Sequence, residues 1–143
     1  MVGVMRTTLT FLLLAVPALA SAQPTNPGQD ALALAIKSQR VLNEYVIGAM
    51  DPEAMKYAQR LRLTKAALDG QRKEWPTITG VTNGPDPWDK FRACKNALEK
   101  ASYLAELSGM KAVSKLEGEV FGVEKAKLQT LRAECDAQIK RSK

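Results

Sequence analysis

The stretch that decides the fold is residues 86–140, which read DPWDKFRACKNALEKASYLAELSGMKAVSKLEGEVFGVEKAKLQTLRAECDAQIK. Apolar side chains recur there at steps of three and four residues, which is the period of an amphipathic helix. The only two cysteines of the chain, Cys94 and Cys135, both fall on these apolar stripes. A turn within residues 109–114 would lie close to midway between them and bring them level. The pattern therefore predicts two antiparallel helices joined by a Cys94–Cys135 disulfide.

The first residues are typical of a secretory signal peptide. Arg6 precedes an apolar run, and residues 20–22 (Ala-Ser-Ala) supply the small side chains that signal peptidase requires. The apolar run is shorter than the roughly 20 residues that span a bilayer, which disfavours an uncleaved anchor. We expect cleavage before Gln23, which removes residues 1–22 and leaves 23–143 as a single domain without a transmembrane span. The expected location is the periplasm, or the medium after secretion.

An oxidising compartment favours a structural disulfide over a reactive thiol or a metal ligand. The two cysteines do not have the spacing of a redox dithiol, and the sequence contains no histidine that could share a metal or activate a thiolate. A Cys94–Cys135 bridge would close a long loop and stabilise the fold by about 4 kcal/mol on the chain-entropy argument. We expect neither a metal nor a cofactor.

Four helix starts are visible in the sequence. Three are an Asn or Asp followed by proline, which combines a side-chain cap with a residue that needs no N–H at the first helical position. The fourth is a Ser-x-x-Glu capping box. These starts lie at Asn26, Asp51, Asp86 and Ser114. We expect helices over residues 27–47, 52–74, 87–108 and 115–140.

Four amphipathic helices of similar length with mostly short connections predict an all-α fold. The arrangement that buries their apolar stripes is an antiparallel up-down four-helix bundle, with one inter-helix disulfide between Cys94 and Cys135. The joint between the first two helices, at residues 48–51, is so short that one kinked helix is the alternative. Two helical hairpins of this kind could also pair between chains, which leaves a homodimer open.

The longest connection, residues 76–86, is rich in β-branched residues and glycine, so we expect it to be extended. Trp75 and Trp88 flank it, and the simpler interpretation is that they pack together and plug one end of the molecule. The alternative is a binding loop on a rigid scaffold. In that case Ile78, Val81 and the two tryptophans would contact a partner protein.

Charge excludes one class of partner and suggests another. The formal net charge is +6, but acidic residues are interleaved with basic ones and aromatic residues are sparse, so we expect no nucleic acid. The helix expected over residues 52–74 is the most basic. Its Lys56 and Arg60 could steer an acidic protein partner, or could contact anionic lipid or cell-wall polymer. A merely solvated basic face is the simpler interpretation.

A catalytic constellation is hard to assemble from these residues. The absence of histidine removes the Ser-His-Asp and Cys-His arrangements. Paired carboxylates could cleave glycosides, and acids do gather at two of the expected helix starts. Acids in a first turn are explained more simply by the positive end of the helix dipole. The carboxylates in question are Asp86, Asp89, Glu117, Glu119 and Glu124.

The sequence therefore favours a small exported protein that is not an enzyme and acts by binding another envelope protein. An inhibitor, an immunity-type protein, an adaptor and a chaperone-like module all fit this description. An envelope-surface module is the alternative, and a carboxylate-dependent hydrolase is the least favoured interpretation.

Overall fold

The computed structural model describes residues 26–77, 86–114 and 119–143. These residues form α-helices and one short 3-10 turn, with no strand among them, which confirms the all-α prediction. The elements are α1 (Pro27–Ala49), α2 (Pro52–Met55), α3 (Ala58–Lys73), η1 (Asp89–Phe91), α4 (Arg92–Ser114) and α5 (Glu119–Lys140).

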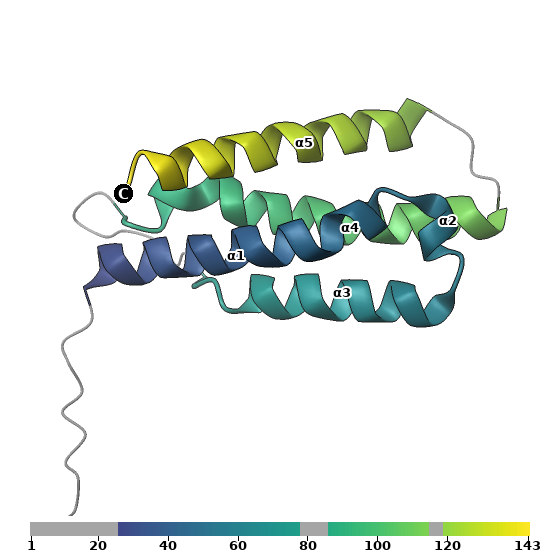
Figure 1. Ribbon diagram of the computed structural model, residues 1–143, viewed down its shortest axis with the longest axis horizontal. Coiled ribbons are helices and arrows are strands. Elements are labelled where there is room, and N and C mark those ends of the chain that lie inside the picture. The colour runs from purple at the N-terminus through teal and green to yellow at the C-terminus, as the bar shows by residue number, and fades with distance from the viewer. Residues whose placement is uncertain (1–25, 78–85, 115–118) are drawn as a thin grey trace, which may run out of the picture.

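The four long helices lie side by side, and each runs opposite to the one before it (Figure 1). The short helix α2 lies where the chain passes from α1 to α3. Helix α4 packs against α1, α3 and α5 and supplies much of the core. Its fully buried side chains are mostly small, which lets three neighbours approach one helix. They are Cys94, Ala97, Leu98, Ala101, Leu104, Ala105 and Ser108.

Two of the predicted caps, Asn26 and Asp51, are present at helix starts, and the third residue, Asp86, makes the same kind of bond within a turn that precedes η1. The side chain of Asn26 accepts a hydrogen bond from the Gly28 N–H at 3.0 Å, and Asp51 accepts one from the Glu53 N–H at 3.0 Å. Asp86 accepts one from the Trp88 N–H at 2.9 Å. Each cap satisfies a backbone donor that the first turn cannot pair.

The helix expected over residues 52–74 is interrupted, so that prediction is wrong in its continuity. The backbone of Tyr57 is extended, with φ −92° and ψ 116°, and separates the single turn α2 from α3. The break lets Met55 turn inward, where it is 3% exposed. Ala58, which a continuous helix would bury, is exposed. A kinked helix through residues 48–51 is not found either, because α1 ends at Ala49 and a new cap begins at Asp51.

Helix α4 also differs from the expectation. It begins at Arg92, after η1, and continues to Ser114 instead of stopping before Gly109. Gly109 is a contact residue within the helix, because a Cβ there would lie only 2.7 Å from Cδ2 of Leu61. Helix α5 begins at Glu119. The capping box proposed for residues 114–117 lies largely outside the described residues.

The predicted disulfide is confirmed. Cys94 and Cys135 are bonded across α4 and α5, with their Cα atoms 4.6 Å apart and a sequence separation of 41. Both are buried among apolar neighbours from α1 and α4. In the described ranges no helix is long and apolar enough to cross a membrane. The predicted signal peptide, residues 1–22, lies outside those ranges.

Candidate functional site

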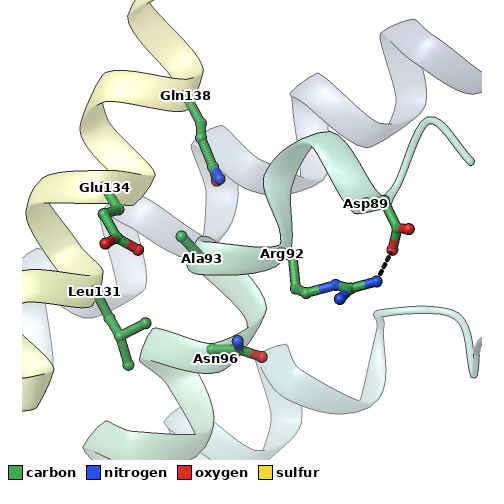
Figure 2. Close-up of a pocket in the computed structure, with 7 residues that line it drawn as sticks. All are labelled: Asp89, Arg92, Ala93, Asn96, Leu131, Glu134 and Gln138. Atoms are coloured by element: carbon green, nitrogen blue, oxygen red, sulfur yellow. Dashed lines mark hydrogen bonds and ion pairs between the residues drawn. The ribbon is translucent and has the colours of Figure 1, made fainter. Parts of the chain in front are cut away.

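A polar hollow of about 440 Å³ lies between η1, the start of α4 and the end of α5 (Figure 2). Arg92 donates a hydrogen bond to Asp89 at 2.7 Å, so the two charges compensate each other. Glu134 faces the hollow from α5. The remaining lining is amide and aliphatic. The hollow thus offers one uncompensated carboxylate and no nucleophile–base pair in the described part of the chain.

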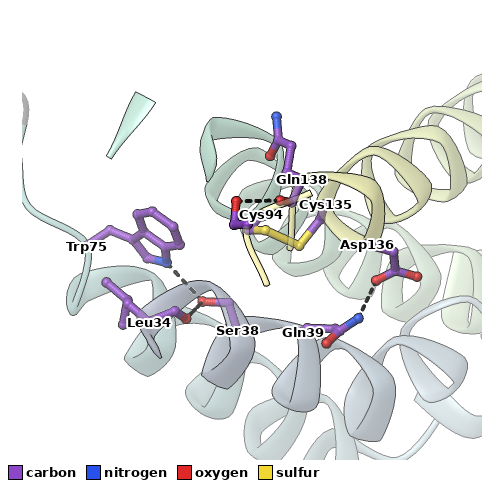
Figure 3. Close-up of a disulfide and its surroundings, with 9 residues drawn as sticks. Leu34, Ser38, Gln39, Trp75, Cys94, Cys135, Asp136 and Gln138 are labelled. Carbon is purple, nitrogen blue, oxygen red and sulfur yellow. Dashed lines mark hydrogen bonds between the residues drawn. A yellow bond between two sulfur atoms is a disulfide. The ribbon is translucent and has the colours of Figure 1, made fainter. Parts of the chain in front are cut away.

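Trp75 and Trp88 close the end of the molecule where α3 stops and α4 begins. Their ring centroids are 6.1 Å apart with an interplanar angle of 75°, an edge-to-face pair. The disulfide lies in the same region (Figure 3). We call this region, defined by Trp75, Trp88, Cys94 and Cys135, the closed end. The two indoles pack together, as the plug interpretation expects.

A buried hydrogen-bond chain fixes Trp75 to α1. The indole N–H donates to Ser38 Oγ at 3.0 Å, and Ser38 Oγ donates in turn to the Leu34 carbonyl at 2.8 Å (Figure 3). Trp75 is only 5% exposed. Lys37 and Glu74 form an ion pair at 2.6 Å beside this chain. Every polar group of the indole is therefore satisfied inside the protein.

The structure does not gather the predicted partner contacts at one place. Trp75 is buried and Trp88 half-buried at the closed end, while Ile78 and Val81 lie outside the described residues. Their role as contacts stays a prediction. The two predicted cations, Lys56 and Arg60, are exposed at the opposite end, around the break between α2 and α3 (Figure 1).

Large apolar side chains are exposed at that opposite end, where α1 and α4 finish and α3 and α5 begin (Figure 1). Ile47 is 70% exposed and Tyr57 59%. We call this region the open end, defined by Ile47, Tyr57, Met110, Val120 and Val123. This region was not predicted from the sequence, because no local pattern shows which apolar residues near helix ends stay uncovered.

An apolar hollow of about 340 Å³ lies at the open end, in the angle between α2, α3 and α4. We call it the α3–α4 hollow. Its lining is Met55, Lys56, Ala58, Leu61, Glu106, Gly109 and Met110. The sequence contained one usable signal, a glycine within a helical pattern, which indicates close approach of a neighbour as readily as a helix end.

Three basic residues belong to the α2–α3 stretch that borders the α3–α4 hollow. A hydrogen bond to Glu53, at 3.3 Å, and the neighbouring Tyr57 raise the pKa of the Lys56 ammonium, which therefore stays charged. Arg60 and Arg62 are exposed, and neither forms an ion pair with any residue that the structure describes.

Three of the five carboxylates considered for catalysis are engaged in structural contacts. Glu124 is 8% exposed and pairs with Lys100 on α4 and with Lys127, the latter at 2.8 Å. Hydrogen bonds from the two lysines lower the pKa of Glu124, and the bond from Lys100 has the larger effect. A lowered pKa is the wrong direction for a general acid. Asp86 accepts a hydrogen bond from the Trp88 N–H in the turn before η1, and Asp89 pairs with Arg92. Glu119 is exposed and Glu117 lies outside the described residues.

Within the described ranges, no three Cys, Asp or Glu side chains are grouped so that they could hold a metal ion.

No protein-family model matches the chain, no curated protein is detectably similar to it, and no solved structure matches its fold.

Proposed function

We propose that this chain is an exported, non-enzymatic protein that acts by binding another envelope protein through its open end. In this proposal residues 1–22 are removed, and residues 23–143 form one antiparallel four-helix bundle in the periplasm. The observation that carries the proposal is the α3–α4 hollow, an apolar depression beside the exposed Tyr57.

The contrast with the closed end supports a role for this surface. Where the protein has a polar partner and neighbouring helices to offer, as for Trp75, the aromatic side chain is buried. Contiguous apolar surface left exposed on a small protein often marks an interaction site. Burying Tyr57 and filling the hollow on association would recover the hydrophobic free energy that folding leaves unused.

The experiment is affinity capture from a periplasmic extract with protein that begins at Gln23, at low and high salt. We compare the wild type with Tyr57→Asp at the open end. The matched control is Ala33→Asp, which adds the same charge at an exposed position of α1 near the closed end. We expect one stoichiometric partner, retained at high salt and by the control, and reduced at least about tenfold by Tyr57→Asp.

Full capture by Tyr57→Asp would overturn the assignment to the open end. The double variant Ile78→Asp/Val81→Asp then tests the loop alternative, in which the connection between α3 and α4 carries the contacts. Loss of the partner in this variant alone would transfer the binding surface to that loop.

A second candidate function is an envelope-surface module that contacts anionic lipid or cell-wall polymer. It is favoured by Arg60 and Arg62, which are exposed without ion pairs in the described part of the chain. Binding of this kind depends on screened charge and should be largely lost at high ionic strength. Sedimentation with vesicles that contain anionic lipid, at low and high salt, separates it from the apolar contact.

A further inference from the structure

The α3–α4 hollow has an apolar floor and a closed inner edge. Gly109 places the α4 backbone directly beneath Leu61, whose Cδ2 lies 2.7 Å from where a Cβ would be. Toward the middle of the molecule, Lys65 reaches across from α3 and donates to Ser102 and Glu106 on α4, both at 3.3 Å. The hollow is therefore held in shape by contacts that exist before any ligand arrives.

The size of the hollow selects what can enter it. At about 340 Å³ it lies near the lower limit of pockets that enclose small ligands, which begin at about 300 Å³. One large apolar side chain fits this space better than a whole helix does. Anchors of this kind dominate the affinity of protein interfaces when they enter a preformed pocket.

The charges around the hollow select the residues that accompany the anchor. Lys56 lines the hollow, and Arg60 and Arg62 flank Leu61 in sequence. The one acid in the lining, Glu106, is already paired with Lys65. Lys56 is paired with Glu53 as well, so the positive charge without an ion pair among the described residues of the α2–α3 side is that of Arg60 and Arg62. Acidic residues beside the anchor would complement it and speed association.

We propose that the α3–α4 hollow takes one bulky apolar side chain from an acidic segment of the partner protein. This inference rests on the proposed function and names the chemistry of its partner. Leu61 and Gly109 form the contact for the anchor, and the exposed Arg60 and Arg62, which carry the unpaired positive charge, attract the acidic residues that accompany it.

The test uses a short fluorescent peptide of glutamate and alanine with one central leucine. Binding to protein that begins at Gln23 is followed by anisotropy, and the site is located by NMR shifts of Leu61 and Gly109. Gly109→Ala should displace Leu61 into the hollow, because the flexible end of that side chain must move away from the new Cβ. The matched control is Gly70→Ala in α3, where a Cβ meets nothing within 4 Å.

We expect the peptide to shift the Leu61 and Gly109 signals. Gly109→Ala in the protein, or alanine in place of the leucine in the peptide, should weaken binding at least about tenfold. Gly70→Ala should leave binding unchanged, and a peptide with lysine in place of glutamate should not bind. Circular dichroism melting establishes that both glycine variants are folded.

Two results would overturn the inference: no binding of the leucine peptide, or equal binding by the Gly109→Ala variant. Either result leaves the proposed function standing if Tyr57→Asp still abolishes capture of the partner, since Tyr57 does not line the hollow. If Tyr57→Asp also captures normally, the open-end assignment falls as well.

Discussion

The aromatic residues at the two ends of α3 differ sharply in exposure. Trp75, just after the helix, is 5% exposed, whereas Tyr57, just before it, is 59% exposed. The Trp75 indole N–H donates to Ser38, and the ring packs edge-to-face with the indole of Trp88. Tyr57 is the extended residue between α2 and α3, and its side chain is exposed to solvent. Aromatic residues are buried here where neighbouring elements can satisfy their polar atoms.

Ties between elements are also distributed unequally. The closed end carries the disulfide, the Trp75–Ser38 bond and the Lys37–Glu74 ion pair, while Asp136 on α5 accepts a hydrogen bond from Gln39 on α1. Toward the open end, α5 is tied to α4 through Glu124 and Lys100. The covalent cross-link is confined to the closed end, whereas toward the open end the further ties are polar, since Ser108 on α4 donates to the Ala49 carbonyl on α1 and Lys65 on α3 pairs with Glu106 on α4.

The largest expected difference between the two ends concerns the disulfide, which stabilises the closed end. The double variant Cys94→Ala/Cys135→Ala should lose about 4 kcal/mol of the free energy of unfolding, because the bridge no longer restricts the unfolded chain. Urea denaturation followed by tryptophan fluorescence measures the loss. Wild-type protein unfolded with reductant is the control and should match the variant. A loss below about 1 kcal/mol would show that the closed end does not depend on its cross-link.

A smaller change removes the acceptor that keeps Trp75 inside. Ser38→Ala leaves the buried indole N–H without its partner, which should cost about 1–3 kcal/mol and increase fluorescence quenching by acrylamide. The control is Ser142→Ala near the chain end, where water can replace the bond to the Gln138 carbonyl, and the change should stay within about 0.5 kcal/mol. Equal effects of the two variants would contradict the special role of Ser38.

The smallest expected effect concerns the tie at Glu124 and depends on pH. Its pKa is lowered in the folded protein from an ordinary value of 4.5. The tie therefore contributes fully above about pH 4.5, and the contribution is lost as the pH falls through the lower folded-state pKa. Glu124→Gln should reduce the melting temperature at about pH 7 more than at about pH 3.

The matched control for this effect is Glu119→Gln, which alters an exposed acid in the first turn of the same helix. It should change the melting temperature little at either pH. An identical loss for Glu124→Gln at both pH values would mean that packing, not charge, ties α5 to α4.

The parts of the fold that were predictable depend on neighbours in sequence. The caps at Asn26 and Asp51, and the turn bond at Asp86, involve a side chain and a backbone N–H two residues away, so local sequence is sufficient to find them. The disulfide followed from two cysteines on two apolar stripes. The tryptophan pair followed from its position at both ends of one connection.

The wrong predictions depend on contacts that sequence does not display. The stretch 52–74 contains good helix formers, yet the helix is interrupted at Tyr57. The interruption lets Met55 be buried and lets α3 pack along α4. Gly109 was expected to stop a helix, but it lies inside α4 because Leu61 of α3 needs the space of its missing side chain. Local propensity is weak compared with such packing.

By itself, then, the sequence determined that the fold is helical, that Asn26 and Asp51 cap helix starts, and that the two cysteines form the one cross-link, because helix period, caps and cysteine number are properties of short stretches or of composition. Only the tertiary structure decided which apolar residues are covered. Trp75 and Tyr57 are indistinguishable as aromatic residues at helix ends until Ser38 and Trp88 are placed beside one of them. The α3–α4 hollow exists for the same reason, since it is a space left between helices and no residue encodes it alone.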